Sequence, residues 1–283
     1  MNSIPNDRSA GRVFVDGTAV PYYSAGAGDD GRPVLVMVHG STGSTESHYG
    51  YLFPMLSFRQ RVVSIDLTRP VQGGALTLDQ LVRQVAAVID QVSGGKPVSL
   101  MGYSLGAVVA AAVAAERPDD VRNLVLVAGW MKTDAHQRLR NGIWRELRTA
   151  DSQALRDYMV LCAFSSDFVA ARTPQELSGM AGKITLDEFV DQQMDLNTRI
   201  DIVDAVARIR ATTLVVGCTH DLMVPKTHSQ QLFGAIEDAR YTQIDSGHAV
   251  VFERPAELLR LVDNFLRQPS AAAAGSLIPA ARP

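Results

Sequence analysis

The sequence predicts an α/β fold built on a mostly parallel, doubly wound sheet, and three observations lead to this prediction. Short runs of Val, Leu and Ile recur along the 283 residues, as in strands that are buried on both faces. Helical patterns lie between most of these runs, and strands that alternate with helices form parallel sheets with right-handed crossovers. The chain is 46% hydrophobic, which is enough for one large domain or for a core domain with a sizeable insertion.

The elements follow one another in a regular order. The chain is expected to open with an antiparallel hairpin, in which residues 12–15 and 18–24 flank the turn signal Asp16-Gly17. Buried strands are expected at residues 34–38, 62–65, 98–101, 124–127, 214–216 and 241–244. Helices are expected at residues 78–92, 105–116, 226–236 and 255–266. Pro118 and Pro255 support the bounds of two of these helices, because proline ends a helix or occupies its first turn.

Residues 131–208 break this alternation. They contain helical patterns at 139–147, 152–164, 173–180 and 185–196, but no convincing buried strand. Because a loop of this length without its own structure would be unusual, we interpret the segment as a helical cap; an insert with no role at the site is the alternative. The α/β core then covers residues 12–130 and 209–267. The tail, residues 268–283, is expected to lack fixed structure, because it combines an alanine run with scattered proline and glycine.

Composition narrows the classes of partner. The 27 basic and 30 acidic residues are mixed along the chain and give a net charge of −3, so no nucleic acid partner is expected. The N-terminus is polar and no apolar run approaches ~18 residues, so we expect no signal peptide, no membrane contact and a cytoplasmic location. Cys162 and Cys218 lack His or Cys neighbours at ligand spacing, so neither a disulfide nor a metal site is expected. The expected partner is a small molecule, and the sequence does not indicate the oligomeric state.

A candidate nucleophile lies between a strand and a helix. Gly102-Tyr103-Ser104-Leu105-Gly106 follows the predicted strand at residues 98–101 and opens the predicted helix at residues 105–116. A serine on such a turn is exposed as a nucleophile elbow, and the glycines remove Cβ atoms that would clash with neighbouring elements. The alternative is a serine that only caps the helix.

A serine hydroxyl needs a base and the base needs an orienting acid. His248 follows the strand at residues 241–244, and its loop belongs to the strand edge that presents Ser104, where open α/β sheets bind ligands. Asp221 follows the strand at residues 214–216 and gives the chain order Ser, Asp, His. Asp134 and Asp245 are competing acids. His248 as an ordinary loop histidine and Asp221 as a turn residue remain the alternatives.

An electrophilic pocket for an oxyanion is expected beside the elbow. His39-Gly40-Ser41-Thr42 follows the strand at residues 34–38. The backbone N–H groups of Ser41 and Leu105 are placed to point at developing negative charge. His39 is interpreted as a residue that structures the loop.

With these pieces in order, the chain resembles the capped enzymes of the α/β-hydrolase fold, which include esterases, thioesterases, lactonases and carbon–carbon bond hydrolases. The resemblance spans residues 12–266. It is carried by His39-Gly40, Gly102-Tyr103-Ser104-Leu105-Gly106, Asp221 with Pro225, and Gly247-His248. Two features depart from the family pattern: Ala107 replaces a second glycine after the elbow, and a polar loop replaces a proline after His39-Gly40.

The resemblance implies a mechanism that needs no metal or organic cofactor. Ser104 would attack an acyl carbonyl, His248 would accept its proton, Asp221 would hold the imidazole, and the amides of Ser41 and Leu105 would bind the oxyanion. A serine at the elbow argues against haloalkane dehalogenases and epoxide hydrolases, whose nucleophile is a carboxylate.

The expected function is hydrolysis of an ester, thioester or lactone of a medium-sized, partly apolar molecule. An acyltransferase, a lyase, a cyclase or a carbon–carbon bond hydrolase on the same scaffold is the alternative, and a ligand receptor would be expected to lack an intact set of Ser, His and Asp. Tyr103, Trp130, Trp144 and Tyr158 are expected to contact the substrate. Aromatic side chains of the cap can instead form the core of the cap itself.

Overall fold

A computed structural model describes residues 8–27, 31–71, 73–182 and 184–279. These residues form an eight-stranded sheet with the order β1-β2-β4-β3-β5-β6-β7-β8. β1 pairs antiparallel with β2 and β2 with β4, whereas all the other neighbours are parallel. The strands are β1 (Ser9–Val15), β2 (Thr18–Ala25), β3 (Leu35–Val38), β4 (Val62–Ile65), β5 (Val98–Tyr103), β6 (Val121–Val127), β7 (Thr212–Cys218) and β8 (Ala239–Ile244).

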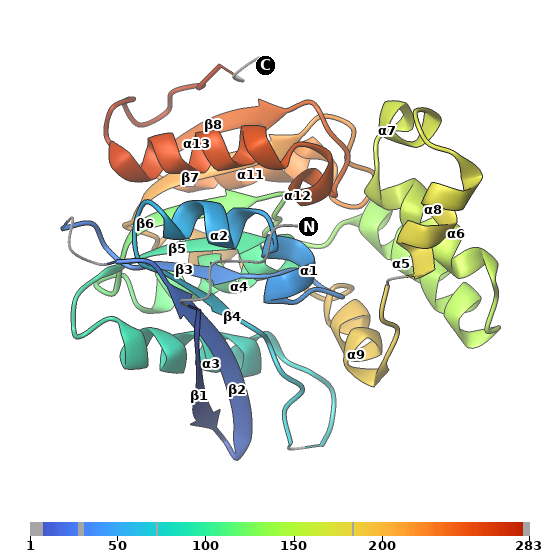
Figure 1. The fold of residues 1–283 in the computed structure, drawn as a ribbon, viewed down its shortest axis with the longest axis horizontal. Coiled ribbons are helices and arrows are strands. Elements are labelled where there is room, and N and C mark those ends of the chain that lie inside the picture. Colours follow the sequence, from blue (N-terminus) through green and yellow to red (C-terminus); the bar gives the residue numbers. More distant parts are fainter. Residues whose placement is uncertain (1–7, 28–30, 72, 183, 280–283) are drawn as a thin grey trace.

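Helices cover both faces of the sheet (Figure 1). One face carries α3 (Leu78–Val92), α4 (Leu105–Glu116) and α11 (Lys226–Ala235); the other carries α1 (Thr45–Tyr49), α2 (Leu52–Ser57), α12 (Val250–Glu253) and α13 (Pro255–Arg267). Alternate residues of one strand enter opposite layers: Val36 and Val38 of β3 join the first, and Leu35 and Met37 the second. This two-sided burial explains why the strands are continuously apolar.

The architecture confirms the predicted α/β fold with its N-terminal antiparallel hairpin. Every predicted strand overlaps an observed one, and several observed strands extend beyond the predicted bounds. The structure adds α1, α2 and α12. Each has four to six residues, little more than one turn, so its sequence has no readable helical period.

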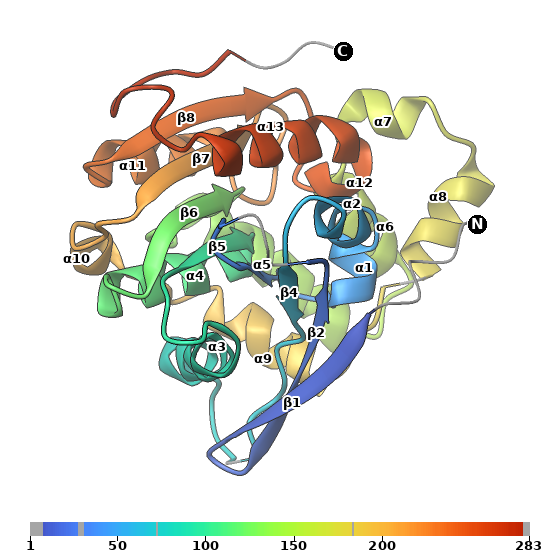
Figure 2. The ribbon, with the colours of Figure 1, turned by 60° about the vertical axis from the view of Figure 1, so that its left-hand side comes forward.

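The described part of residues 131–208 is helical. Helices α5 to α9 lie together beyond the carboxyl ends of the parallel strands in Figure 1. α10 lies apart from α7 and α8, as Figure 2 shows, and it contacts α4 and α11. The helices are α5 (Ala135–Thr149), α6 (Ala154–Ala163), α7 (Ser166–Ala170), α8 (Pro174–Gly182), α9 (Glu188–Leu196) and α10 (Val203–Val206).

The end of this segment packs with the core. Ile200, Ile202 and Val206 are buried in the apolar layer that contains α4. The core therefore resumes before residue 209, the predicted boundary, because these three side chains complete its apolar layer. The apolar spacing in this stretch covers too few residues to distinguish a turn of the core from a helix of the cap.

The tail differs from its prediction. Residues 272–278 form hydrogen bonds with β8 instead of lacking fixed structure, and residues 280–283 lie outside the described residues. The Gly275 N–H donates to the Ala239 carbonyl at 2.8 Å, and the Ile278 N–H donates to the Tyr241 carbonyl at 2.7 Å. Leu277 forms a parallel bridge with Tyr241. The outer edge of β8 offers backbone partners, and a composition typical of disorder does not reveal them.

Deleting residues 268–283 is expected to lower the thermal midpoint. Each lost backbone hydrogen bond removes about 0.5–1.5 kcal/mol, so the three that join residues 275–278 to β8 should together lower the midpoint by roughly 3–18 °C for a chain of this size. Differential scanning calorimetry measures the change. Leu277→Ser is the control, because the Leu277 side chain is 71% exposed and its backbone bridge is kept. A midpoint that is unchanged by the deletion would show that the contacts along β8 add no stability.

Candidate active site

The backbone folds sharply at Ser104, between the end of β5 and the start of α4. Ser104 has φ 56° and ψ −123°, a conformation that residues with a side chain rarely adopt. The flanking glycines permit close backbone contacts: a Cβ atom on Gly102 would lie 2.1 Å from the Gly106 carbonyl oxygen, and one on Gly106 would lie 2.1 Å from the Val38 carbonyl oxygen. The turn leaves the Ser104 side chain lining a cavity at the carboxyl edge of the sheet.

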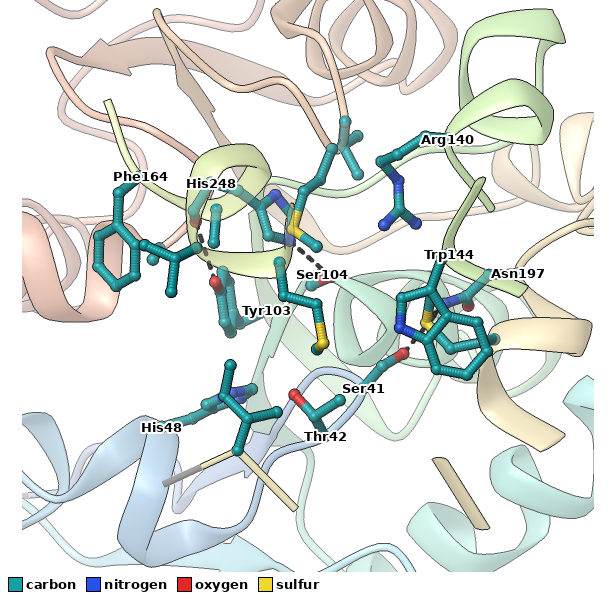
Figure 3. Close-up of a pocket in the computed structure, with 18 of the residues that line it drawn as sticks. Ser41, Thr42, His48, Tyr103, Ser104, Arg140, Trp144, Phe164, Asn197 and His248 are labelled. Atoms are coloured by element: carbon teal, nitrogen blue, oxygen red, sulfur yellow. Dashed lines mark hydrogen bonds between the residues drawn. The ribbon is translucent and has the colours of Figure 1, made fainter. Parts of the chain in front are cut away.

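His248 lies in the loop after β8, and its ring faces Ser104 (Figure 3). Its Nε2 lies 2.9 Å from Ser104 Oγ. Two hydrogen bonds hold this loop: the Tyr103 hydroxyl donates to the His248 carbonyl at 2.9 Å, and the Gly247 N–H donates to Glu253 Oε2 at 2.7 Å. The ring is therefore fixed within reach of the Ser104 hydroxyl.

Asp221 lies in the loop after β7, on the other side of the His248 ring. Its Oδ2 is 2.6 Å from His248 Nδ1, and its side chain is fully buried. Its Oδ1 accepts from the N–H groups of Met223 at 2.8 Å and Val224 at 2.7 Å. A carboxylate beside Nδ1 favours the tautomer with a proton on Nδ1, which leaves Nε2 free to accept from Ser104.

The two competing acids have other partners. Asp134 caps α5 by accepting from the Gln137 N–H at 2.9 Å, and it also lies 3.2 Å from His228 Nε2. Asp245 accepts from Thr219 Oγ1 at 2.9 Å and contacts the His220 ring at 2.8 Å. The geometry therefore favours Asp221 as the residue that orients His248.

The loop that follows β3 approaches the elbow closely. A Cβ atom on Gly40 would lie 2.8 Å from Ser104 Cβ. Two side chains of the insertion bind the loop: Gln193 Oε1, on α9, accepts from the Thr42 N–H at 3.1 Å, and Asn197 Nδ2, at the C-cap of α9, donates to Ser41 Oγ at 3.0 Å. Thr42 has φ 63°, so the loop keeps a strained turn while bound to the insertion.

Leu105, the other expected oxyanion residue, is the first residue of α4. The first N–H groups of a helix have no carbonyl acceptor within the helix, and they favour negative charge. The loop at Ser41 and the start of α4 thus flank Ser104. This arrangement is suited to two amides that receive an oxyanion.

Two histidines, one buried (His39) and one partly buried (His48), support the loop as neutral rings. His39 Nε2 accepts from the Leu67 N–H at 3.0 Å, so its Nδ1 carries the proton and donates to the Gly40 carbonyl at 2.8 Å. His48 Nδ1 accepts from the Gly40 N–H at 3.3 Å. Burial, together with the nearby His39 and His248, lowers the pKa of His48 to about 3.

The low pKa of His48 predicts a loss of stability in acid. The unfolded pKa is about 6.5, so below this pH the unfolded chain binds a proton that the folded chain does not bind until about pH 3. The contribution of the neutral His48 ring to the free energy of unfolding should therefore be fully present at pH 7. It should decrease as the pH falls below 6.5. In urea titrations between pH 5 and 8, His48→Gln is expected to show a smaller fall than the wild type. Equal slopes for the two proteins would contradict this assignment.

The cavity beside Ser104 has a volume of about 540 Å³, within the usual size range of small-molecule sites. Of the expected substrate contacts, Tyr103, Trp130 and Trp144 line it. Tyr158 is not among the lining residues: it packs against the apolar cluster around Trp144 and donates its hydroxyl to the Arg140 carbonyl at 3.0 Å. Helical spacing could not decide whether this aromatic side chain faces the cavity or the core of the insertion.

Sequence reasoning missed the polar side of the cavity. Gln137, Arg140, Asn141 and Trp144 line it together. They lie at positions i, i+3, i+4 and i+7 of α5, which places them on one face of the helix. Polar residues on the hidden face of an amphipathic helix are a signal that the sequence carries.

Other chemistry-bearing groups are separate from this site. Cys162 and Cys218 are buried, and burial raises the pKa of both thiols, which disfavours a thiolate nucleophile. Within the described residues, no group of three or more His, Cys, Asp or Glu side chains could hold a metal ion. No helix in the described ranges is long and apolar enough to cross a membrane.

Comparisons with known proteins identify the family of this chain. A sequence model of the alpha/beta hydrolase family matches residues 35–261. The pyrrolizixenacetamide deacetylase of Xenorhabdus hominickii is 32% identical over 263 residues, covering 90% of this chain and 97% of that protein.

Solved structures share the fold. An alpha/beta hydrolase enzyme from a Medee basin deep-sea metagenome library matches with a TM-score of 0.80 at 19% identity, covering 91% of this chain and 98% of its own. The enol-lactonase of Burkholderia xenovorans LB400 matches with a TM-score of 0.76 at 21% identity, covering 91% of this chain and all of its own (100%).

Proposed function

Because the chain belongs to the alpha/beta hydrolase family, we propose that it is a serine hydrolase that cleaves an acyl bond with Ser104, His248 and Asp221. The observation that carries the proposal is the continuous hydrogen-bonded path from Ser104 Oγ through the His248 ring to Asp221, with distances of 2.9 and 2.6 Å. These distances lie within the reach that proton transfer between a nucleophile and its base requires.

In the proposed mechanism, Ser104 Oγ attacks the acyl carbon while His248 Nε2 accepts the hydroxyl proton. The imidazolium that forms is stabilised by the Asp221 carboxylate, which the amides of Met223 and Val224 hold in place. His248 then donates its proton to the leaving group as the carbonyl bond reforms. In the second half, His248 takes a proton from water, the hydroxide attacks the acyl-enzyme, and Ser104 leaves with that proton.

The negative charge on the carbonyl oxygen falls on the side of the site where Ser41 and Leu105 lie. Losing one donor of such a pair costs about 3 kcal/mol of transition-state stabilisation in other enzymes. The Gln193 and Asn197 contacts support this role, because they hold the loop of Ser41 close to Ser104. In this proposal the insertion acts as a cap, supplying one wall of the cavity.

The proposed substrate is an ester, thioester or lactone of a medium-sized small molecule. A cavity of about 540 Å³ suits such a substrate, and Trp130, Met159, Val160 and Phe164 give it apolar walls. A second candidate is removal of an acetyl group from an amide, because the Xenorhabdus hominickii relative is named a deacetylase. Both reactions pass through an acyl-enzyme on Ser104, and in the deacetylation His248 must protonate an amine as the leaving group.

Substitution of the nucleophile tests the proposal. Ser104→Ala is expected to lower kcat on 4-nitrophenyl acetate by at least about 1000-fold and to abolish labelling by a fluorophosphonate probe. Thermal denaturation serves to check that the variant is folded. Parallel assays with 4-nitroacetanilide then separate esterase from amidase activity. If the probe labels the Ser104→Ala variant at the wild-type rate, the assignment of Ser104 as the nucleophile is wrong.

Substitution of the acid tests the orientation of His248. Asp221→Asn is expected to lower kcat by up to about 10⁴-fold, because an amide cannot hold the same imidazole tautomer or stabilise the imidazolium. Asp134→Asn, on the candidate acid that instead caps α5, is the matched control and should change kcat far less. A larger loss in Asp134→Asn than in Asp221→Asn would reassign the acid.

A further inference from the structure

One side of the cavity presents N–H donors that have no acceptor. Arg140 Nε, Asn141 Nδ2 and Trp144 Nε1 are buried, and none has a hydrogen-bond partner among the residues that the structure describes. All three side chains line the cavity that contains Ser104. In Figure 3, Arg140 and Trp144 extend from α5 toward the space beside Ser104. Buried donors are normally paired, so their convergence on one cavity points to a ligand that supplies acceptors.

The charge of Arg140 supports a ligand that is an anion. Among the described residues, no carboxylate oxygen lies within 4 Å of its guanidinium, and its terminal nitrogen donates to Asn141 Oδ1 at 2.5 Å. Two other arginines of the insertion have acceptors: Arg148 pairs with Asp191, and Arg156 donates to two backbone carbonyls. Burial lowers the pKa of Arg140, an effect that the more distant charge of Asp221 only partly opposes. A desolvated guanidinium without a counter-charge is unfavourable until an anion binds.

The type of donor indicates the type of anion. A guanidinium is a planar fork of N–H groups that matches a carboxylate. The bond from Arg140 fixes Asn141 with its oxygen toward the guanidinium, so the amide nitrogen is left to donate elsewhere. The indole of Trp144 can only donate. All three donors lack an acceptor. Together they match a group that has several acceptor lone pairs and a negative charge.

We propose that Arg140, Asn141 and Trp144 form a subsite for a carboxylate of the substrate, so that the enzyme prefers acyl compounds that carry a free carboxylate away from the scissile bond. This inference rests on the proposed function, because it places the scissile carbonyl at Ser104. The apolar walls of the same cavity fit a short hydrocarbon spacer between the two groups. Arg140 acts in this scheme as a specificity residue, since it binds the substrate away from the reacting atoms.

A pair of matched esters tests the preference. Monomethyl adipate and methyl hexanoate have chains of equal length and differ in the terminal carboxylate; acid release is followed with a pH indicator. The wild type is expected to favour the monomethyl adipate by about 10- to 100-fold in kcat/KM. Arg140→Gln should abolish this preference mainly through a higher KM for monomethyl adipate. Arg138→Gln, on an exposed arginine of the same helix, should keep the preference.

A binding measurement separates this inference from the proposed chemistry. Adipate is titrated into Ser104→Ala and into Ser104→Ala with Arg140→Gln, and fluorescence is read from the two tryptophans of the chain, both of which line the cavity. Binding that Arg140→Gln weakens at least about tenfold supports the subsite even if neither ester is hydrolysed. If Arg140→Gln does not fold, Trp144→Phe takes its place, because it removes the indole donor and retains an aromatic ring. Hydrolysis that depends on Ser104 without a preference for monomethyl adipate would overturn the subsite and leave the hydrolase proposal standing.

Discussion

The close approach of three backbone segments at Ser104 is the constraint on which the site depends. β5 ends, α4 begins, and the end of β3 passes beside them, at distances that leave no space for a Cβ atom at Gly102 or Gly106. The strained conformation of Ser104 costs on the order of 1–3 kcal/mol, and the burial of α4 from Leu105 to Ala115 offsets it. A hydroxyl on a flexible loop would lose its alignment with His248. Here the sheet and a fully buried helix fix it.

The insertion and the core hold one another in the arrangement that the site needs. Gln193 of α9 and Asn197 at its C-cap bind the loop of Ser41. At the opposite side, the Ala249 N–H donates to the Ala163 carbonyl at 2.7 Å, beside His248. Glu253 accepts from Ser165 as well as from Gly247, so one carboxylate joins the insertion to the loop of His248. A displacement of the insertion would therefore disturb both loops that flank Ser104.

The sequence predicted well where one local pattern has one structural meaning. Apolar runs of Val and Leu are long enough to mark buried strands, and a glycine-flanked serine after such a run marks the elbow at Ser104. Because the carboxyl ends of parallel strands share an edge, Asp221 and His248 could be placed near Ser104 without coordinates. The distances that favour Asp221 over Asp134 and Asp245 depend on loop conformations, which no periodicity encodes.

Other features depend on contacts between distant segments and could not be predicted. Tyr158 and Trp144 are both aromatic residues of the insertion, but only Trp144 reaches the cavity. In the sequence, Arg140 cannot be distinguished from the surface arginines of α5. Only the structure shows that its face of the helix lines the cavity. The composition of the tail, an alanine run with scattered proline and glycine, says nothing about the free edge of β8.

The tail along β8 also bears on how copies of this chain meet one another. An open edge strand displays N–H and C=O groups that can pair with a strand of another molecule, which is a common route to aggregation. In this chain, residues 275–278 occupy those groups at Ala239 and Tyr241, so the end of the same molecule shields the edge. A version that ended after α13 would display them. Its sheet would be open to extension by a foreign strand, although every residue around Ser104 would be unchanged.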